Sequence, residues 1–176
     1  MFTEDVMNKQ GFTLVEVLTT VLIIGVLASI AMPMYMRSIE RARATEAMAT
    51  IKSLNDATYA YFQDKEACPE RLSQLVATLP SGTDTECPAT DKTLACTKNF
   101  KFALGGAADP IPGTGGACMG VLATRIHGGS YNYWIWNPYT RCTSGKALAL
   151  QCDAPEGNTK SIAVCESLGL YRESNT

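Results

Sequence analysis

The longest apolar stretch of the chain lies near its start. From Val17 to Met36, 20 consecutive residues carry no charge, and one carboxylate, Glu16, stands immediately before them. At about 1.5 Å of rise per residue, a helix of this length spans about 30 Å, the thickness of the hydrocarbon core of a bilayer. The pattern predicts a membrane-spanning helix. Glu16 needs a partner, because an unpaired carboxylate near lipid costs about 2–3 kcal/mol or more.

Beyond Met36 the apolar positions recur every three or four residues, with charged residues between them. This period predicts that one helix continues from Thr13 to about Gln63, roughly 75 Å in all. Its second half is amphipathic, and we expect the apolar face to pack on a sheet. The apolar face carries Ala47, Met48, Ile51, Leu54, Thr58, Tyr61 and Phe62. The opposite face carries Lys52, Asn55, Asp56 and Gln63.

The rest of the chain shows strand patterns separated by turn residues. A short helical piece is expected from Glu70 to Thr78, and a final short segment from Ile162 to Leu170. Strands joined by turns predict an antiparallel sheet that covers the long helix with one face. The expected fold class is therefore α+β, a long N-terminal helix packed on a four-stranded antiparallel sheet. The predicted strands are Phe100–Leu104, Met119–Ile126, Tyr131–Trp136 and Ala147–Cys152.

The six residues at positions 11–16, Gly-Phe-Thr-Leu-Val-Glu, form a specific motif. They resemble the processing site of type IV prepilins and the related pseudopilins, and Gly25 and Pro33 stand where that family has a helix-loosening Gly and Pro. The resemblance implies that a dedicated prepilin peptidase cuts after Gly11 and methylates the new N-terminal residue, Phe12. It also implies a pilin-like lollipop, a long helical stick carrying a globular head.

The resemblance divides the chain into three parts. Residues 1–11 are expected to be a leader peptide, residues 12–63 the long helix, and residues 64–176 the globular head. Within the helix, residues 12–36 would form the membrane or filament core, and residues 37–63 the amphipathic half.

The charges of the leader bear on where translation starts. The leader has only one basic residue, Lys9, beside Glu4 and Asp5, whereas a start at Met7 would leave it net positive, as cytoplasmic flanks usually are. We hypothesise initiation at Met7, and mapping of the start to Met1 alone would exclude it.

Glu16 lies one helical turn after Phe12. Its carboxylate can therefore pair with the amine that cleavage would free, in the same chain or in a neighbour, and this attraction is strong at low dielectric. The alternative is a carboxylate that only reaches toward the membrane interface. The resemblance implies that Phe12, Glu16, Gly25 and Pro33 are assembly residues, with the region from Gly25 to Pro33 loosening so that helices pack.

Seven cysteines follow the apolar stretch and indicate an oxidising compartment with disulfides. Zinc spacing is absent, because there is no C-x-x-C pair and only one histidine. No metal or cofactor is expected. The cysteines are Cys68, Cys87, Cys96, Cys118, Cys142, Cys152 and Cys165.

Two disulfide pairings are expected. If the second and third strands form a hairpin around Gly128-Gly129, Cys118 lies beside the region after Pro138, which suggests a Cys118–Cys142 bridge. A Cys152–Cys165 bridge would resemble the C-terminal disulfide loop of many pilins. Two of the three remaining cysteines would pair, leaving one free or bonded between subunits. Those three are Cys68, Cys87 and Cys96.

No convincing catalytic set is present, and no enzymatic activity is expected. A triad would depend on His127, which sits in a turn beside two glycines. The formal net charge of −2 argues against a general nucleic-acid surface. One aromatic cluster could stack sugars or bases, or simply pack the core. It comprises Tyr131, Tyr133, Trp134, Trp136 and Tyr139.

Three functions are compatible with these features. The first is a structural subunit of a type IV pilus. The second is a pseudopilin of a type II secretion system. The third is a membrane-tethered binding or enzymatic domain that never polymerises; Glu16 argues against it, because a lone tether has no need of that carboxylate.

The resemblance also implies a location and partners. The expected location is the bacterial inner membrane, crossed once with the head outside the cytoplasm, and after assembly an extracellular pilus. The expected partners are copies of itself or related pilins, prepilin peptidase, the inner-membrane assembly machinery and the lipid bilayer.

Overall fold

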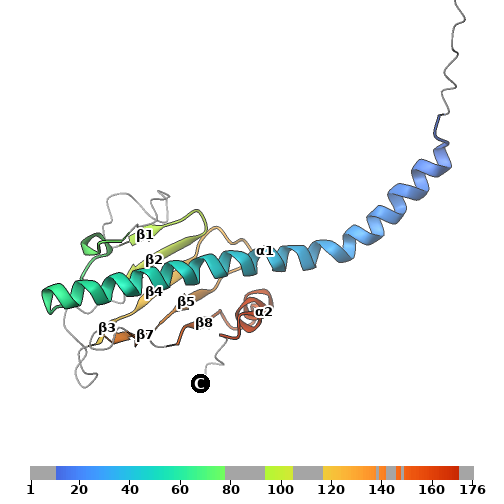
Figure 1. The fold of residues 1–176 in the computed structure, drawn as a ribbon. Helices are drawn as coiled ribbons and strands as arrows, with labels where there is room; N and C mark the ends of the chain where they lie inside the picture. The colour runs from blue at the N-terminus through green and yellow to red at the C-terminus, as the bar shows by residue number, and fades with distance from the viewer. Residues whose placement is uncertain are drawn as a thin grey trace, which may run out of the picture. The chain divides into compact units, whose positions relative to one another are not determined.

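The computed structural model describes residues 11–77, 94–104, 117–137, 139–141, 146–147 and 149–170. It divides into two compact units between Ile39 and Glu40. The first unit is the start of helix α1. The second unit contains the rest of α1 and the head (Figure 1).

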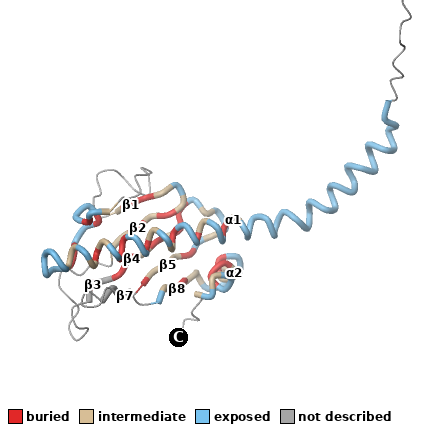
Figure 2. The backbone as a smooth tube through the Cα atoms, viewed as in Figure 1, coloured by how far each residue is buried: buried red, intermediate tan, exposed pale blue. Residues whose placement is uncertain are grey.

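Helix α1 runs from Leu14 to Lys65, so the predicted long helix is confirmed to within two residues at each end. It is long and apolar enough to cross a membrane. From Leu14 to Ser38 every residue is exposed in the isolated chain (Figure 2). The hydroxyls of Thr19, Thr20 and Ser29 donate to backbone carbonyls three residues earlier, at 2.7–3.0 Å. Because these polar groups are satisfied inside the helix, the segment is compatible with lipid.

The second half of α1 buries one stripe of side chains against the head. Asn55, expected on the polar face, belongs to this stripe and is 4 % exposed. The expectation was wrong because position 55 is four residues after Ile51 and three before Thr58, which places all three on one side of the helix. The buried residues of α1 are Glu40, Ala44, Ala47, Ile51, Leu54, Asn55 and Thr58.

The main sheet is antiparallel, as predicted, but it has five strands instead of four, in the order β1-β2-β4-β5-β8. The unpredicted strand is β1, whose three residues are too few to show a period. It exists because it pairs with β2, with Leu94 opposite Ala103. The strands are β1 Leu94–Cys96, β2 Phe100–Leu104, β4 Val121–Arg125, β5 Trp134–Trp136 and β8 Gln151–Asp153.

A second, three-stranded sheet contains β3 Ala117–Met119, β6 Tyr139–Arg141 and β7 Lys146–Ala147. Two predicted strands are therefore each divided between the two sheets. The first division falls at Gly120, where the backbone of Asn137 approaches so closely that a Cβ on the glycine would lie 1.9 Å from its carbonyl oxygen. The Asn137 side chain accepts a hydrogen bond from the amide of Val121 at 2.9 Å, which starts β4 in the new direction.

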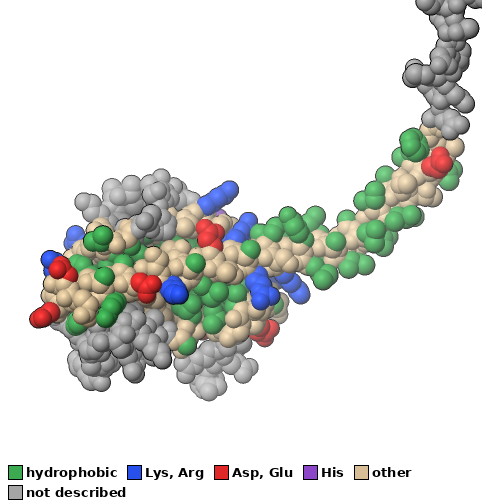
Figure 3. Space-filling model, viewed as in Figure 1, with side chains coloured by type: hydrophobic (Ala, Val, Ile, Leu, Met, Phe, Trp, Pro, Cys, Tyr) green, Lys and Arg blue, Asp and Glu red, His purple; other side chains and the backbone are tan. Residues whose placement is uncertain are grey.

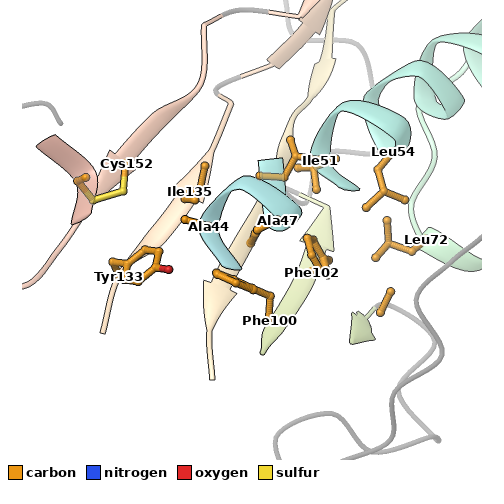
Figure 4. Close-up of a cluster of buried hydrophobic side chains, with 14 of the residues drawn as sticks. Ala44, Ala47, Ile51, Leu54, Leu72, Phe100, Phe102, Tyr133, Ile135 and Cys152 are labelled. Atoms are coloured by element: carbon orange, nitrogen blue, oxygen red, sulfur yellow. A yellow bond between two sulfur atoms is a disulfide. The ribbon is translucent and has the colours of Figure 1, made fainter. Parts of the chain in front are cut away.

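The core lies between the second half of α1 and one face of the main sheet (Figure 4). Ala44, Ala47 and Ile51 of α1 pack with Phe100 and Phe102 of β2. Burying each large apolar side chain contributes about 1.5–3 kcal/mol, so this layer is the main source of stability. The strands complete it with Val121, Ala123, Tyr133, Ile135 and Cys152.

Two short helices close the edges of the head. The predicted helical piece after α1 is only one turn, η1 Leu72–Gln74, because the Gln74 side chain accepts from the amides of Glu70 and Arg71 at 2.8 and 2.9 Å and closes the turn. Helix α2 runs from Thr159 to Ser167. The side chain of Asn158 caps it by accepting from the amide of Ser161 at 3.1 Å.

Two disulfides of the head have both partners among the described residues. Cys152 of β8 is bonded to Cys165 of α2, as expected from the sequence. Cys118 is bonded to Cys68, with their Cα atoms 5.5 Å apart, so the predicted Cys118–Cys142 bridge is wrong. The β4–β5 hairpin does form, but the register of the small sheet places Thr140 opposite Cys118. The chain leaving α1 brings Cys68 to the same place, where the bridge packs against Phe62.

This pairing also changes the expectation for the other cysteines. Cys96 is disulfide-bonded as well. Cys68 is no longer available to pair with Cys87 or Cys96. Cys87 and Cys142 lie outside the described residues.

Candidate functional site

The start of α1 is capped by two of its own residues. Residues 11–13 are exposed and not helical. The Glu16 carboxylate accepts hydrogen bonds from the amide and the hydroxyl of Thr13, at 2.9 and 2.7 Å, and the Glu16 amide donates to that hydroxyl at 3.3 Å. This reciprocal pattern is a capping box, and it defines Leu14 as the first helical residue. The Gly11-Phe12 peptide therefore lies just outside the helix, and Phe12 is 87 % exposed.

The two helix-loosening residues lie inside α1. The helix is continuous through Gly25 and Pro33 in this single chain. A Cβ at Gly25 would meet no atom within 4 Å, so its own fold does not require glycine there. Proline in a helix removes one backbone hydrogen bond and weakens the turn before it. Both residues thus make this stretch easier to unwind than the rest of the helix.

The second unit contains a buried ion pair that the sequence did not predict. Glu40 of α1 is 1 % exposed and Arg125 of β4 is 6 % exposed. The guanidinium donates to both carboxylate oxygens, from Nε to Oε1 and from Nη2 to Oε2 at 3.3 Å. Tyr133, the residue directly before β5, donates its hydroxyl to Oε1 at 3.1 Å, and Arg43 donates to Oε2 at 2.9 Å. One carboxylate thereby joins α1 to β4 and to the residue that precedes β5.

Arg125 makes further contacts in this network. Its Nη1 donates to the carbonyl of Asn99, at 2.8 Å, and to that of Ile126. Its guanidinium carbon lies 5.5 Å from the centre of the Phe100 ring, within the range of a cation–π interaction. No buried polar side-chain atom in the described part of the chain lacks a hydrogen-bond partner. Because both charges are compensated, the network can persist in the interior.

The network also determines the ionisation of its members. Burial alone would raise the pKa of Glu40, but the hydrogen bonds and the charge of Arg125, with hydrogen bonds from Arg43 and Tyr133, outweigh it and lower the pKa of that carboxyl. Burial, together with the charge and the hydrogen bond of Glu40, raises the pKa of Tyr133 far above its ordinary range. At neutral pH Glu40 is therefore an anion, and Tyr133 is a neutral donor.

A sequence signal for Glu40 existed. Glu40 precedes Ala44, Ala47 and Ile51 by four, seven and eleven residues, which places it on the same buried stripe. A charge on the apolar face of an amphipathic helix requires a buried partner of opposite sign. The pattern did not identify Arg125, because only the sheet brings β4 under this part of α1.

The remaining candidates lie apart from these two sites. His127 is exposed in a turn and has a φ of 52°. Tyr133 is fully buried in the core and Tyr131 packs against it, which agrees with the core-packing interpretation of these two aromatics. Trp134 and Trp136 are half-buried and alternate with the buried Ile135, so they lie on the other face of β5. The side chain of Tyr139 lies outside the described residues. No group of three His, Cys, Asp or Glu side chains suited to a metal is found among the residues described.

Comparison with known protein families matches the start of the chain. Residues 6–32 fit the family model described as the prokaryotic N-terminal methylation motif. This range includes Gly11, Phe12, Glu16 and Gly25. Pro33 follows it directly.

Curated proteins are similar over about a third to three fifths of the chain. A type IV major pilin protein PilA of Myxococcus xanthus is 39 % identical over 59 residues, covering 34 % of this chain and 27 % of that protein. A type II secretion system core protein G of Pseudomonas aeruginosa is 32 % identical over 81 residues, covering 46 % and 57 %. A fimbrial protein of Moraxella nonliquefaciens is 33 % identical over 116 residues, covering 61 % and 75 %. The first two alignments thus span about a quarter and just over half of the relative's own length.

Proposed function

The chain belongs to the family of type IV pilins and related pseudopilins, and from this premise we propose that it is a structural subunit of a type IV pilus. One observation carries the proposal. The Gly11–Glu16 motif stands directly before 20 uncharged residues whose side chains are exposed in the isolated chain. Such an apolar surface must be buried. Lipid buries it before assembly, and the α1 helices of other subunits bury it in a filament.

Processing is the first step of this function. A prepilin peptidase cuts after Gly11, removing residues 1–11 and freeing the amine of Phe12, which becomes methylated. The non-helical, exposed backbone at residues 11–13 supports this step, because a protease needs an extended segment at the cut.

The Glu16 carboxylate then guides the docking of one subunit on another. In the uncut chain its Oε2 accepts from the Thr13 amide and hydroxyl. Cutting adds a cation one turn away, at the amine of Phe12. In the apolar environment of a filament, the attraction between this amine and a Glu16 carboxylate of a neighbouring subunit is stronger than it is in water, and it brings helices into register. Gly25 and Pro33 allow the helix to loosen as it packs.

The location follows from the same segment. Before assembly α1 anchors the chain in the bacterial inner membrane with the head outside the cytoplasm. Afterwards the subunit is part of an extracellular filament. The disulfides of the head support an oxidising compartment. Its partners are copies of itself or related pilins and the inner-membrane assembly machinery, and we assign it no catalytic role.

The second candidate is a pseudopilin of a type II secretion system. It is favoured by the similarity to core protein G of three bacteria. The pilus is preferred because those alignments span 62–81 residues, whereas the alignment with the fimbrial protein spans 116 residues and reaches well into the head. Mass spectrometry of filaments sheared from the cell surface separates the two, since only a pilus subunit is recovered there in quantity.

The variant Glu16→Ala tests the proposed role of Glu16 in filament assembly. We expect normal insertion of the variant into the inner membrane and normal removal of the leader, but few or no filaments. Glu46→Ala is the matched control, because it removes an exposed carboxylate from the second half of the same helix. Filament yield equal to the wild type in Glu16→Ala would contradict the proposal.

A further inference from the structure

Three segments of the head meet around Glu40. The turn after β1 is joined to Arg125 and Ile126 through the carbonyl of Asn99, at 2.8 and 3.0 Å. The turn between β4 and β5 starts after Arg125 and ends before Tyr133, and both of these residues bond Glu40. The start of α2 joins the same turn, because Asn158 donates to the carbonyl of Ser130 and the hydroxyl of Ser161 accepts from the amide of Asn132.

These segments present basic side chains, which we call the basic rim. Lys98 stands in the first turn and Lys160 near the start of α2, and both are exposed. Arg41 and Arg43 are contributed by α1 beside Glu40. Figure 3 shows Lys and Arg side chains gathered at this end of the head. The exposed carboxylates nearest in sequence to the rim are Glu46 and Glu156.

The rim retains positive charge after its internal pairing. Arg43 pairs with Glu40, but Glu40 is also paired with Arg125, so this trio carries a net charge of +1. Arg41, Lys98 and Lys160 have no ion pair within the described part of the chain. The chain as a whole has a formal net charge of −2, so the basic surface is a local feature.

Covalent connection keeps this surface near the membrane. Only three residues separate Met36, the end of the apolar stretch, from Glu40, which corresponds to about 6 Å of helix rise. The headgroup region of a bilayer adds about 5–7 Å on each side of the hydrocarbon core. The backbone at Glu40 is therefore within reach of lipid headgroups.

We propose that the basic rim binds the phosphates of anionic phospholipids in the leaflet from which the head emerges. This inference rests on the proposed membrane anchoring of α1. A Lys or Arg at an anionic surface strengthens binding about fivefold, so several acting together hold the head against the bilayer. The unassembled subunit is then retained in a defined position, and the rim is released from lipid when the subunit enters a filament.

The test uses the full chain in vesicles of neutral phosphatidylcholine, or of phosphatidylcholine with about one third phosphatidylglycerol. Insertion is checked first by resistance to alkaline extraction. Accessible lysines are then acetylated with a short pulse of a neutral reagent and quantified by mass spectrometry. We expect Lys98 and Lys160 to react at least threefold more slowly in anionic vesicles, and 0.5 M salt to abolish the difference. Lys52, about three turns beyond Arg41 on α1, is the internal control and should not change.

A charge variant tests whether the rim acts as one surface. Arg41→Glu should remove most of the protection of Lys98 and Lys160, whereas the matched Lys52→Glu should leave it intact. Equal reactivity in both kinds of vesicle, or protection that Arg41→Glu does not alter, would overturn the proposal. If Arg41→Glu instead reduces crosslinking between copies without affecting lipid protection, the rim binds protein and the lipid proposal is wrong. Failure to insert into either vesicle would refute the membrane anchoring itself.

Discussion

Arg125 on β4 donates to both carboxylate oxygens of Glu40, which lies 85 positions earlier on α1. This pair is the only ion pair with both side chains buried in the described residues. Glu40 is the first residue of the second unit, four positions after the end of the uncharged run at Met36. Because the geometry is bidentate, it sets both the rotation and the axial position of α1 on the sheet.

Removing one partner of this pair should strongly destabilise the head. Glu40→Ala leaves the buried Arg125 without its carboxylate, and we expect a loss of about 3–5 kcal/mol in the free energy of unfolding. Urea unfolding in a nonionic detergent, followed by the fluorescence of Trp134 and Trp136, measures it.

Two further variants test whether burial of the pair is the cause. Arg43→Ala removes a partner whose side chain is 39 % exposed, so it should change the free energy by no more than about 1 kcal/mol. The double variant Glu40→Met with Arg125→Met should recover much of the loss, because no buried charge is left unpaired. Equal destabilisation by Glu40→Ala and Arg43→Ala would contradict this account.

The same pair should make the head sensitive to acid. The pKa of Glu40 is lower in the folded protein than its ordinary value of 4.5. The unfolded chain therefore takes up the proton first as the pH falls, and stability is lost from about pH 4.5 downward through the folded pKa.

Unfolding curves between pH 7 and pH 2 test this. Glu40→Gln should be less stable than the wild type at neutral pH. Its free energy of unfolding should fall less on acidification than that of the wild type. Glu46→Gln, which changes an exposed carboxylate on the same helix, should follow the wild-type curve. A Glu40→Gln curve parallel to that of the wild type would show that another group is responsible.

The Cys152–Cys165 and Cys68–Cys118 disulfides should differ in their contribution to stability according to the loops they close. The Cys152–Cys165 bridge spans 13 positions and the Cys68–Cys118 bridge spans 50. In the chain-entropy model their removal costs about 3 and about 4 kcal/mol. Paired Cys→Ala variants, compared by urea unfolding, should show the larger loss for the bridge between Cys68 and Cys118. The reverse order would mean that packing around each bridge outweighs loop entropy.

Gly120 should not tolerate a side chain. Its Cβ would lie 1.9 Å from the backbone oxygen of Asn137, and backbone cannot give way as a flexible side chain can. We expect Gly120→Ala to destabilise the head by several kcal/mol, a typical result of a forced backbone shift.

Gly129→Ala is the control for this substitution. Gly129 has a φ of 59° and open space around its Cα, so alanine there should cost only about 1 kcal/mol of backbone strain. Thermal melting in detergent, monitored by circular dichroism, compares the two. Similar melting temperatures would show that the backbone at Gly120 can move.

Local patterns in the sequence were sufficient for the helix and for the motif before it. An uncharged run of 20 residues, followed by an apolar stripe with helical spacing, defines α1 whatever surrounds it, because both signals come from neighbours within a few turns. The Gly11–Glu16 motif lies in one continuous stretch and is equally visible without a structure. The Cys152–Cys165 bridge was also predicted, from the resemblance to the C-terminal disulfide loop of pilins.

Only the tertiary structure determined the features that join residues distant in sequence, namely a strand pairing, a disulfide and the buried ion pair. Strand β1 exists because β2 offers it a partner, and Cys118 bonds to Cys68 because the chain leaving α1 meets the small sheet there. Glu40 was visible as a charge on an apolar stripe, but its partner Arg125 becomes adjacent only when the sheet packs on the helix. Hydrophobic periodicity specifies which face of an element is buried, and only the pairing and packing of distant elements specifies what that face meets.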